Sequence, residues 1–211
     1  MSYKTDAYAI TANTIIKNLE KRNMEGFYCK DSKELLEKVL PMLEENSMIA
    51  WGGSETIKET GLLDALKEGN FELIDRMQAT NDKERREYFG KTAMSDYFFM
   101  STNAITLGGE LVNIDGNGNR VSALIHGPAH VFIIAGMNKV VTDIAAGIER
   151  TRNMASPPNA VRLNKTTPCG KIGHCGDCYS PDCMCNQIVV TRRSGHVGRI
   201  KVFLVGEELG F

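Results

Sequence analysis

Five of the six cysteines in this 211-residue chain lie in one short segment. They follow the spacing C-x5-C-x2-C-x4-C-x-C, and glycines and a proline between them let a short backbone fold around a point. The five are Cys169, Cys175, Cys178, Cys183 and Cys185. Four convergent thiolates are the ligand set of a structural zinc or an iron–sulfur cluster. We therefore expect a metal here. The spacing does not choose between the two, and free or redox-active thiols are the alternative.

A glycine loop between an apolar run and a helical pattern is the first candidate for ligand binding. Gly52, Gly53 and Ser54 follow the apolar residues 48–51. Backbone N–H groups and a hydroxyl at a helix N-terminus suit an anion. The alternative is a tight turn in which Ser54 is only the N-cap.

A second candidate combines Thr102 and Asn103 with the turn Gly108, Gly109 and Glu110. A carboxylate beside two glycines after a strand could act as a base or a nucleophile if burial raises its pKa. Glu110 is therefore the candidate catalytic residue, and an exposed turn residue is the alternative.

The third candidate follows the longest apolar run, 131–137. Asn138 and Lys139 stand between this buried strand and a helical pattern, where ligands of open α/β sheets tend to bind. They could hold a carboxylate or a phosphate. A lysine that is simply solvated is the alternative.

Helices and short apolar strands alternate along the chain and must position these residues. This βαβα order predicts a parallel sheet covered by helices. A hairpin of 110–114 and 121–125 around the Gly- and Asn-rich loop 115–119 would make the sheet mixed. Strands are expected at 27–29, 48–51, 71–74, 97–100, 104–107, 110–114, 121–125, 131–135, 187–192 and 200–205. Helices are expected at 6–22, 31–43 with a break near Pro41, 54–67, 81–94 and 140–154, the last ended by Ser156, Pro157 and Pro158.

Length and composition fit one domain over residues 1–211, with the cysteine-rich loop 168–186 inside it. The formal net charge is −1, so a dedicated nucleic-acid-binding protein is not expected. Residues 139–211 hold 10 basic and 6 acidic side chains, which suits a local anion site. The N-terminus lacks an apolar signal-peptide core, and the longest apolar run cannot span a bilayer. We expect a cytoplasmic protein, in which structural disulfides are not expected.

Several of these motifs together resemble the LUD-domain family, named for lactate utilisation, and its lactate utilisation protein C group. The resemblance spans nearly the whole chain. It is carried by Trp51 to Ser54, Thr102 to Thr106, Leu111 to Arg120, Val131 to Lys139 and the segment from Pro168 to Cys185.

The resemblance implies a Rossmann-like three-layer α/β/α fold with a mixed, mostly parallel sheet. That fold is similar to those of glucosamine-6-phosphate deaminase, ribose-5-phosphate isomerase and CoA transferases. The catalytic acid and histidine of the deaminase have no match here, so that chemistry is not carried over. In the tail, Cys183 stands where relatives have arginine. The resemblance therefore implies Cys169, Cys175, Cys178 and Cys185 as the main ligands and Cys183 as the spare.

The expected function is a component of lactate or related organic-acid utilisation, with lactate oxidised to pyruvate. It implies a small anionic metabolite as ligand and an iron–sulfur protein as a partner, and it leaves homo-oligomer formation open. One alternative is a non-enzymatic binding subunit stapled by zinc. Another is a phosphosugar isomerase or CoA-transferase-type enzyme that uses Glu110.

Overall fold

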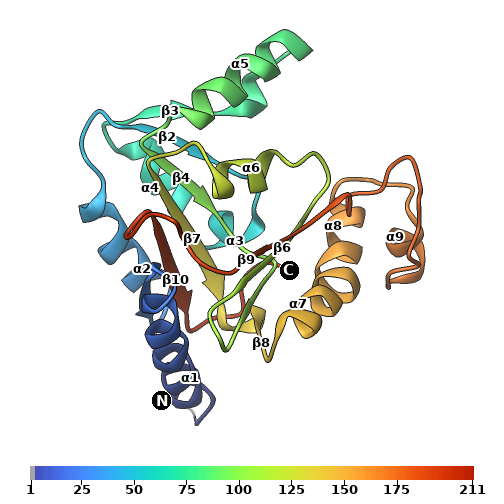
Figure 1. The fold of residues 1–211 in the computed structure, drawn as a ribbon. Helices are drawn as coiled ribbons and strands as arrows, with labels where there is room; N and C mark the ends of the chain where they lie inside the picture. Colours follow the sequence, from blue (N-terminus) through green and yellow to red (C-terminus); the bar gives the residue numbers. More distant parts are fainter. Residues whose placement is uncertain (1–2) are drawn as a thin grey trace.

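A computed structural model describes residues 3–211, and its centre is a six-stranded sheet (Figure 1). Every pairing in this sheet is parallel. The spatial order is β1 (Glu25–Cys29), β10 (Ile200–Val205), β7 (His130–Gly136), β4 (Tyr97–Met100), β2 (Met48–Trp51) and β3 (Glu72–Ile74). The central strands β4 and β7 are almost wholly buried and apolar, as parallel strands covered on both faces must be.

Helices cover both faces and give a three-layer α/β/α architecture. On one face, α2 (Ser32–Val39), α3 (Glu55–Glu59) and α4 (Leu62–Glu68) bury Leu35, Ile57 and Leu66 against Phe132 and Phe203. On the other face, α1 (Tyr3–Glu20) and α6 (Asn119–Ile125) pack against the sheet. The peripheral helix α5 (Asp82–Ala93) has no buried residue.

A second, smaller sheet is joined to the face that α1 and α6 cover. Its order is β8 (Val140–Val141), β5 (Ala104–Thr106), β6 (Leu111–Asp115) and β9 (Gln187–Thr191). Ile105 and Leu111 belong to the same core cluster as α1. The strands β5 and β6 form an antiparallel hairpin. The sequence predicted one mixed, mostly parallel sheet. In the structure the large sheet is parallel, and the antiparallel pairings lie in the small sheet.

The chain between β8 and β9 forms a lobe of short helices at the side of the molecule (Figure 1). It contains α7 (Ile144–Arg150), a π-helical turn at Thr151–Ala155, α8 (Ser156–Arg162) and α9 (Pro168–Ile172). The remaining short turns are 3-10 segments at Leu40–Met42, Arg76–Gln78 and Met137–Lys139. Within residues 3–211, no helix combines the length and apolar character needed to cross a bilayer.

Local sequence signals placed several helix ends correctly. The Asp31 carboxylate accepts a hydrogen bond from the Glu34 N–H, and the Asn81 side chain does the same for Glu84. The helix that starts after Asp31 ends at Val39, and the 3-10 turn around Pro41 follows it.

The predicted strand at 121–125 is wrong, because these residues belong to α6. Val121 and Leu124 are buried whereas Ile125 is 64% exposed, which is a helical spacing. Gly118 begins the helix with a φ of 79°, and the Asp115 carboxylate accepts hydrogen bonds from the Asn117 and Gly118 N–H groups. The partner of β6 is therefore β5 on one side and β9 on the other.

The predicted helix at 140–154 begins too early and ends too early. Val140 and Val141 extend the small sheet by pairing with β5, and Asp143 then caps α7. Ser156, Pro157 and Pro158 do not stop the helical path but form the first turn of α8. A proline lacks the N–H that a first helical turn leaves unpaired in any case, so this position tolerates it.

Candidate functional site

The loops after β2 and β4 leave the large sheet in opposite directions. The loop after β2 enters α3 on one face, whereas the chain after β4 enters β5 on the other face. Because β2 and β4 are neighbours, their carboxyl ends form the crevice where open α/β sheets bind ligands. Thr56 follows β2, Ser101 follows β4, and Lys139 follows the adjacent strand β7.

Lys139 is the central cation of this crevice and is only 4% exposed. Its Nζ donates hydrogen bonds to Thr56 Oγ1 at 2.9 Å and Ser101 Oγ at 3.1 Å. Burial, and then the nearby positive charges of Arg150 and Arg120, lower the pKa of Lys139 to about 7. The amine is therefore close to half protonated at neutral pH.

Two arginines surround the lysine. Arg150 is 8% exposed, and its guanidinium donates to the Asn138 carbonyl at 3.0 Å and the Asn103 carbonyl at 2.7 Å. Arg120 donates to the Ser101 and Ile114 carbonyls and to the side chains of Asn103 and Asn113. Its Nε also lies 3.6 Å from a carboxylate oxygen of Asp115. Burial lowers the pKa of each arginine.

Charge balance in this crevice is incomplete. Within residues 3–211, no Asp or Glu side chain lies within 4.0 Å of the Lys139 amine or the Arg150 guanidinium. The Arg150 guanidinium also donates to the main-chain oxygen of Phe211 at 3.4 Å. Taking cations out of water costs free energy unless an anion compensates them. The arrangement of Lys139, Arg150 and Arg120, which we call the sheet-edge site, is thus suited to receive a small anion.

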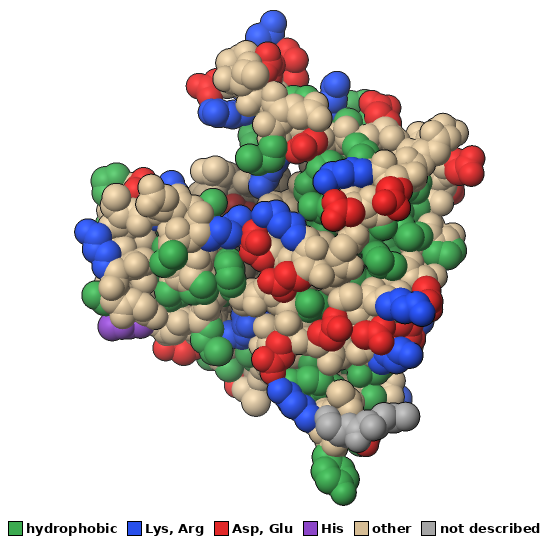
Figure 2. Space-filling view, turned by 180° about the vertical axis from the view of Figure 1, so that it is seen from behind, with side chains coloured by type: hydrophobic (Ala, Val, Ile, Leu, Met, Phe, Trp, Pro, Cys, Tyr) green, Lys and Arg blue, Asp and Glu red, His purple; other side chains and the backbone are tan. Residues whose placement is uncertain are grey.

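Other cations lie near this crevice. Seen from behind, Lys and Arg side chains gather with acidic ones in the hollow between the lobe of α8 and α9 and the body (Figure 2). An ion pair of 3.1 Å joins Arg162 of α8 to Glu55 of α3. Burial lowers the pKa of Arg76, while the charges of Asp115 and Asp75 act in the opposite direction.

Most of the residues that the sequence predicted near the sheet-edge site hold other side chains or backbone segments in position. Asn103 holds Arg120, and the Asn138 amide exchanges hydrogen bonds with the Leu209 backbone. Ser54 caps α3 by accepting from the Ile57 N–H at 3.3 Å. The Thr102 hydroxyl already has partners within the protein, because it donates to carbonyls of β5 and β6.

The two loop glycines permit close approach of arginines. A Cβ on Gly52 would lie 3.4 Å from the Arg120 side chain, and one on Gly53 would lie 2.9 Å from Arg76. A side chain at Gly53 would therefore displace the Arg76 guanidinium.

The segment after β10 lies over the sheet-edge site. The Thr56 hydroxyl donates to the Leu209 carbonyl at 3.3 Å, and the Gly210 N–H donates to Glu59 at 2.6 Å. A Cβ on Gly210 would lie 3.5 Å from Lys139 Nζ. A ligand that contacts Lys139 must therefore displace this segment or bind beside it.

Glu110 and its two glycines form a different group. The Glu110 carboxylate forms an ion pair with Arg22 and accepts a hydrogen bond from the Thr106 hydroxyl. Burial alone would raise the pKa of Glu110, but hydrogen bonds from Thr106 and the Glu110 backbone and the charge of Arg22 outweigh it. The net pKa is lowered, which makes this carboxylate a weaker base. Its predicted catalytic role stays a prediction.

The cysteine-rich segment does not form a ready metal site as it stands. Within residues 3–211, no three His, Cys, Asp or Glu side chains are arranged to hold a metal ion. All six cysteines are free thiols. Cys175 Sγ accepts from Arg152 Nε at 3.2 Å, and Cys185 Sγ lies 3.6 Å from the Ser156 hydroxyl.

Some of these thiols nevertheless lie near one another. Burial raises the pKa of Cys185, and the charges of Cys183, Cys175 and Cys169 act in the same direction. Thiols are suitable ligands for a metal ion, but in the described residues 3–211 they are not arranged close enough together to hold one. The remote Cys29 is buried in the core, and burial raises its pKa to about 11, as expected for an inert thiol.

Fold and site together define an α/β protein with a cationic crevice at the carboxyl edge of a parallel sheet. Residues 12–205 match the LUD domain, so the chain belongs to the LUD domain family. No curated protein matches the sequence.

Two solved structures match this chain, one of them with a likeness of the whole fold. The crystal structure of a DUF162 family protein from Deinococcus radiodurans is similar with a TM-score of 0.55 and 11% identity, over 94% of this chain and 98% of that one. At this identity the likeness shows the fold alone. The crystal structure of eIF2B delta from Chaetomium thermophilum gives a TM-score of 0.36 and 15% identity, over 66% of this chain and 54% of that one.

Two residues of the sheet-edge site, Arg120 and Arg150, and the two hydroxyl partners of Lys139, Thr56 and Ser101, were not singled out as site residues from the sequence. Ser101 carried a usable signal, because it directly follows a buried strand. Arg120 directly follows the loop 115–119 that was assigned to a hairpin. Arg150 lies on the buried face of α7, and nothing in its local sequence indicates that it turns toward Lys139.

Proposed function

We propose that this LUD-domain protein binds a small organic acid at the sheet-edge site and serves in the utilisation of lactate or a related acid. The observation that carries the proposal is the pair of buried cations, Lys139 and Arg150, with which no Asp or Glu side chain within residues 3–211 pairs. The family membership supports the metabolic class of the ligand.

The chemistry of the donors favours a carboxylate that also carries a hydroxyl or carbonyl oxygen. An ammonium and a guanidinium bind carboxylate oxygens through charge-assisted hydrogen bonds. The Thr56 and Ser101 hydroxyls, each beside the Lys139 amine, offer further donors or acceptors for a neighbouring oxygen. Lactate and pyruvate combine these groups in one small molecule.

Calorimetry with L-lactate, D-lactate, pyruvate and inorganic phosphate tests the proposal. We expect an organic acid to bind wild-type protein and Lys139→Met to weaken it about tenfold or more, since a hydrogen bond to a charged group contributes about 1.5–3 kcal/mol. Lys67→Met is the matched control, because Lys67 is exposed on α4 and, within the described part of the chain, pairs only with Asp64. Absence of binding by any of the acids, or equal binding by Lys139→Met, would refute the proposal.

A metal at the cysteine-rich segment, an iron–sulfur partner protein and a cytoplasmic location belong to the same proposal. Thiolate donors support a zinc ion or an iron–sulfur cluster at Cys169, Cys175, Cys178, Cys183 and Cys185. Metal analysis and a visible spectrum of protein purified without oxygen test it. We expect bound zinc or iron that falls in a Cys175→Ser/Cys178→Ser variant. Metal content that is unchanged in the variant would contradict these ligands.

A further inference from the structure

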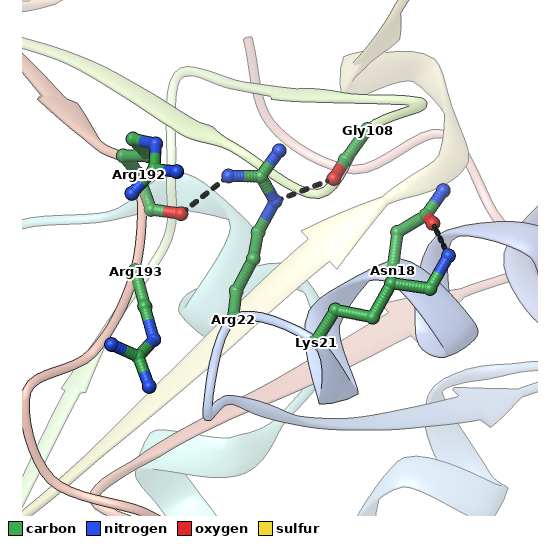
Figure 3. A pocket seen from close by; sticks show the side chains of 6 residues that line it. All are labelled: Asn18, Lys21, Arg22, Gly108, Arg192 and Arg193. Carbon is green, nitrogen blue, oxygen red and sulfur yellow. Dashed lines mark hydrogen bonds between the residues drawn. The ribbon is translucent and has the colours of Figure 1, made fainter.

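A second cationic cavity lies away from Lys139, at the end of α1. It encloses about 200 Å³ and is lined by Asn18, Lys21, Arg22, Gly108, Arg192 and Arg193 (Figure 3). Three separate parts of the chain contribute to it: the end of α1, the turn between β5 and β6, and the segment after β9. We call it the α1 cavity.

Arg22 holds these three parts together. Its Nε donates to the Gly108 carbonyl at 2.7 Å, and one terminal nitrogen donates to the Arg192 carbonyl at 2.5 Å (Figure 3). Its other terminal nitrogen pairs with Glu110. The wall of the cavity is therefore fixed by contacts that are distant in sequence, and the Glu110 carboxylate is already bound to Arg22.

The other cations have no anionic partner. The Arg192 and Arg193 side chains form no hydrogen bond or ion pair with any residue in 3–211, and both are exposed. Among the residues that the structure describes, the Lys21 amine donates only to the Asn18 side chain, at 3.0 Å. Four cationic residues thus line one cavity, and Glu110 forms an ion pair with Arg22 among them.

Helix capping explains part of this charge but not all of it. Lys21 and Arg22 follow the C-terminus of α1, where cations interact favourably with the helix dipole. Arg192 and Arg193 come from a different segment and gain nothing from α1. Placing like charges together costs free energy unless an anion binds between them.

We infer that the α1 cavity binds the phosphate group of a small molecule. Guanidinium groups match phosphate oxygens in geometry and charge, and they can donate two parallel hydrogen bonds to one phosphate. A phosphate group with two negative charges balances an excess of cations better than a monocarboxylate does. The inference is independent of the function proposed for Lys139, because the two sites share no lining residue.

Calorimetry at constant ionic strength with inorganic phosphate and pyrophosphate tests this site. We expect binding of at least one of them to wild-type protein and to Lys139→Met, with about one anion per α1 cavity. Arg192→Gln/Arg193→Gln should weaken it about a hundredfold, taking about tenfold for each charged hydrogen-bond donor. Tighter binding of pyrophosphate than of phosphate would assign the cavity to a diphosphate, and the reverse order to a single phosphate.

A matched control separates a site from general positive charge. Arg85→Gln/Arg86→Gln removes two adjacent arginines from α5, far along the chain from the cavity, and should leave phosphate binding unchanged. Lys21→Gln provides a second single-residue test that spares the Arg22 contacts. Equal phosphate affinity in wild type and Arg192→Gln/Arg193→Gln would overturn the inference, as would an equal loss in the α5 control or no phosphate or pyrophosphate binding at all.

Discussion

At the residue scale, we expect Lys139 to make the binding of an anionic ligand dependent on pH. Its pKa is about 7, and an anion beside it would favour the protonated amine. We therefore expect affinity for an organic acid to fall as the pH rises from about 6 to about 9, by at most about tenfold per pH unit. Binding at about pH 8 should take up a proton, which calorimetry in two buffers of different ionisation enthalpy measures. Affinity that is constant across this range would exclude contact between the acid and Lys139.

The same residue should limit the stability of the unliganded protein. The pKa of Lys139 is about 7 in the folded protein and 10.5 for an ordinary lysine. Between about pH 7 and pH 10.5 the unfolded chain therefore binds a proton at Lys139 that the folded protein does not. Stability therefore falls as the pH drops through this window and levels off below about 7. Lys139→Met should raise the free energy of unfolding at pH 7 by about 1–3 kcal/mol, after the loss of two hydrogen bonds.

Urea denaturation at about pH 7 and pH 10 checks this expectation. The advantage of Lys139→Met should shrink at the higher pH, whereas Lys67→Met should follow wild type at both. A variant that is less stable than wild type at pH 7 would show that the amine stabilises the fold. Gain of stability with loss of ligand binding is the pattern of a residue kept for function.

At the element scale, the turn between β5 and β6 depends on a glycine against α1. Gly109 has a φ of 86°, and a Cβ there would lie 3.2 Å from the Leu19 backbone nitrogen. Gly109→Ala should therefore lower the free energy of unfolding by about 1–3 kcal/mol. Gly90 lies inside α5, and a Cβ on it meets nothing within 4 Å. Gly90→Ala should raise stability by about 0.5–1 kcal/mol. Equal effects of the two changes, measured by thermal denaturation, would contradict this account.

Apolar pattern predicted elements well where burial is continuous and poorly where it is short. The strands β4 and β7 are apolar over their whole length, so their type could be read directly. The five residues 121–125 fit either period, and the choice of helix depends on the turn at Gly118 and on Arg120 contacts from other segments. Val140 and Val141 form a strand only because β5 is beside them.

At the scale of the whole molecule, strand order decided which predicted loops meet. Lys139 contacts Thr56 and Ser101, which are 83 and 38 residues away in the chain. The sequence indicates that each follows a strand, but it does not indicate that β2, β4 and β7 are neighbours. The same topology separates Glu110 from Lys139 and assigns it to Arg22. Two candidate loops that looked equivalent therefore belong to two different sites.

The ion pair between Arg22 and Glu110 should give the whole fold a specific sensitivity to acid, because it joins the end of α1 to the hairpin of the small sheet. The pKa of Glu110 is lowered on folding, so its contribution is present above its ordinary value of 4.5 and is lost as the pH falls through the lower folded value. Glu110→Gln should cost about 1–2 kcal/mol near pH 7, as a partly buried charged hydrogen bond does, and less near pH 3, because the contribution of the ionised carboxylate declines below pH 4.5. Urea unfolding at both pH values measures this difference, with Glu87→Gln on the exposed helix α5 as control. A cost for Glu110→Gln that is the same at both pH values would show that the side chain contributes through its shape and not through its charge.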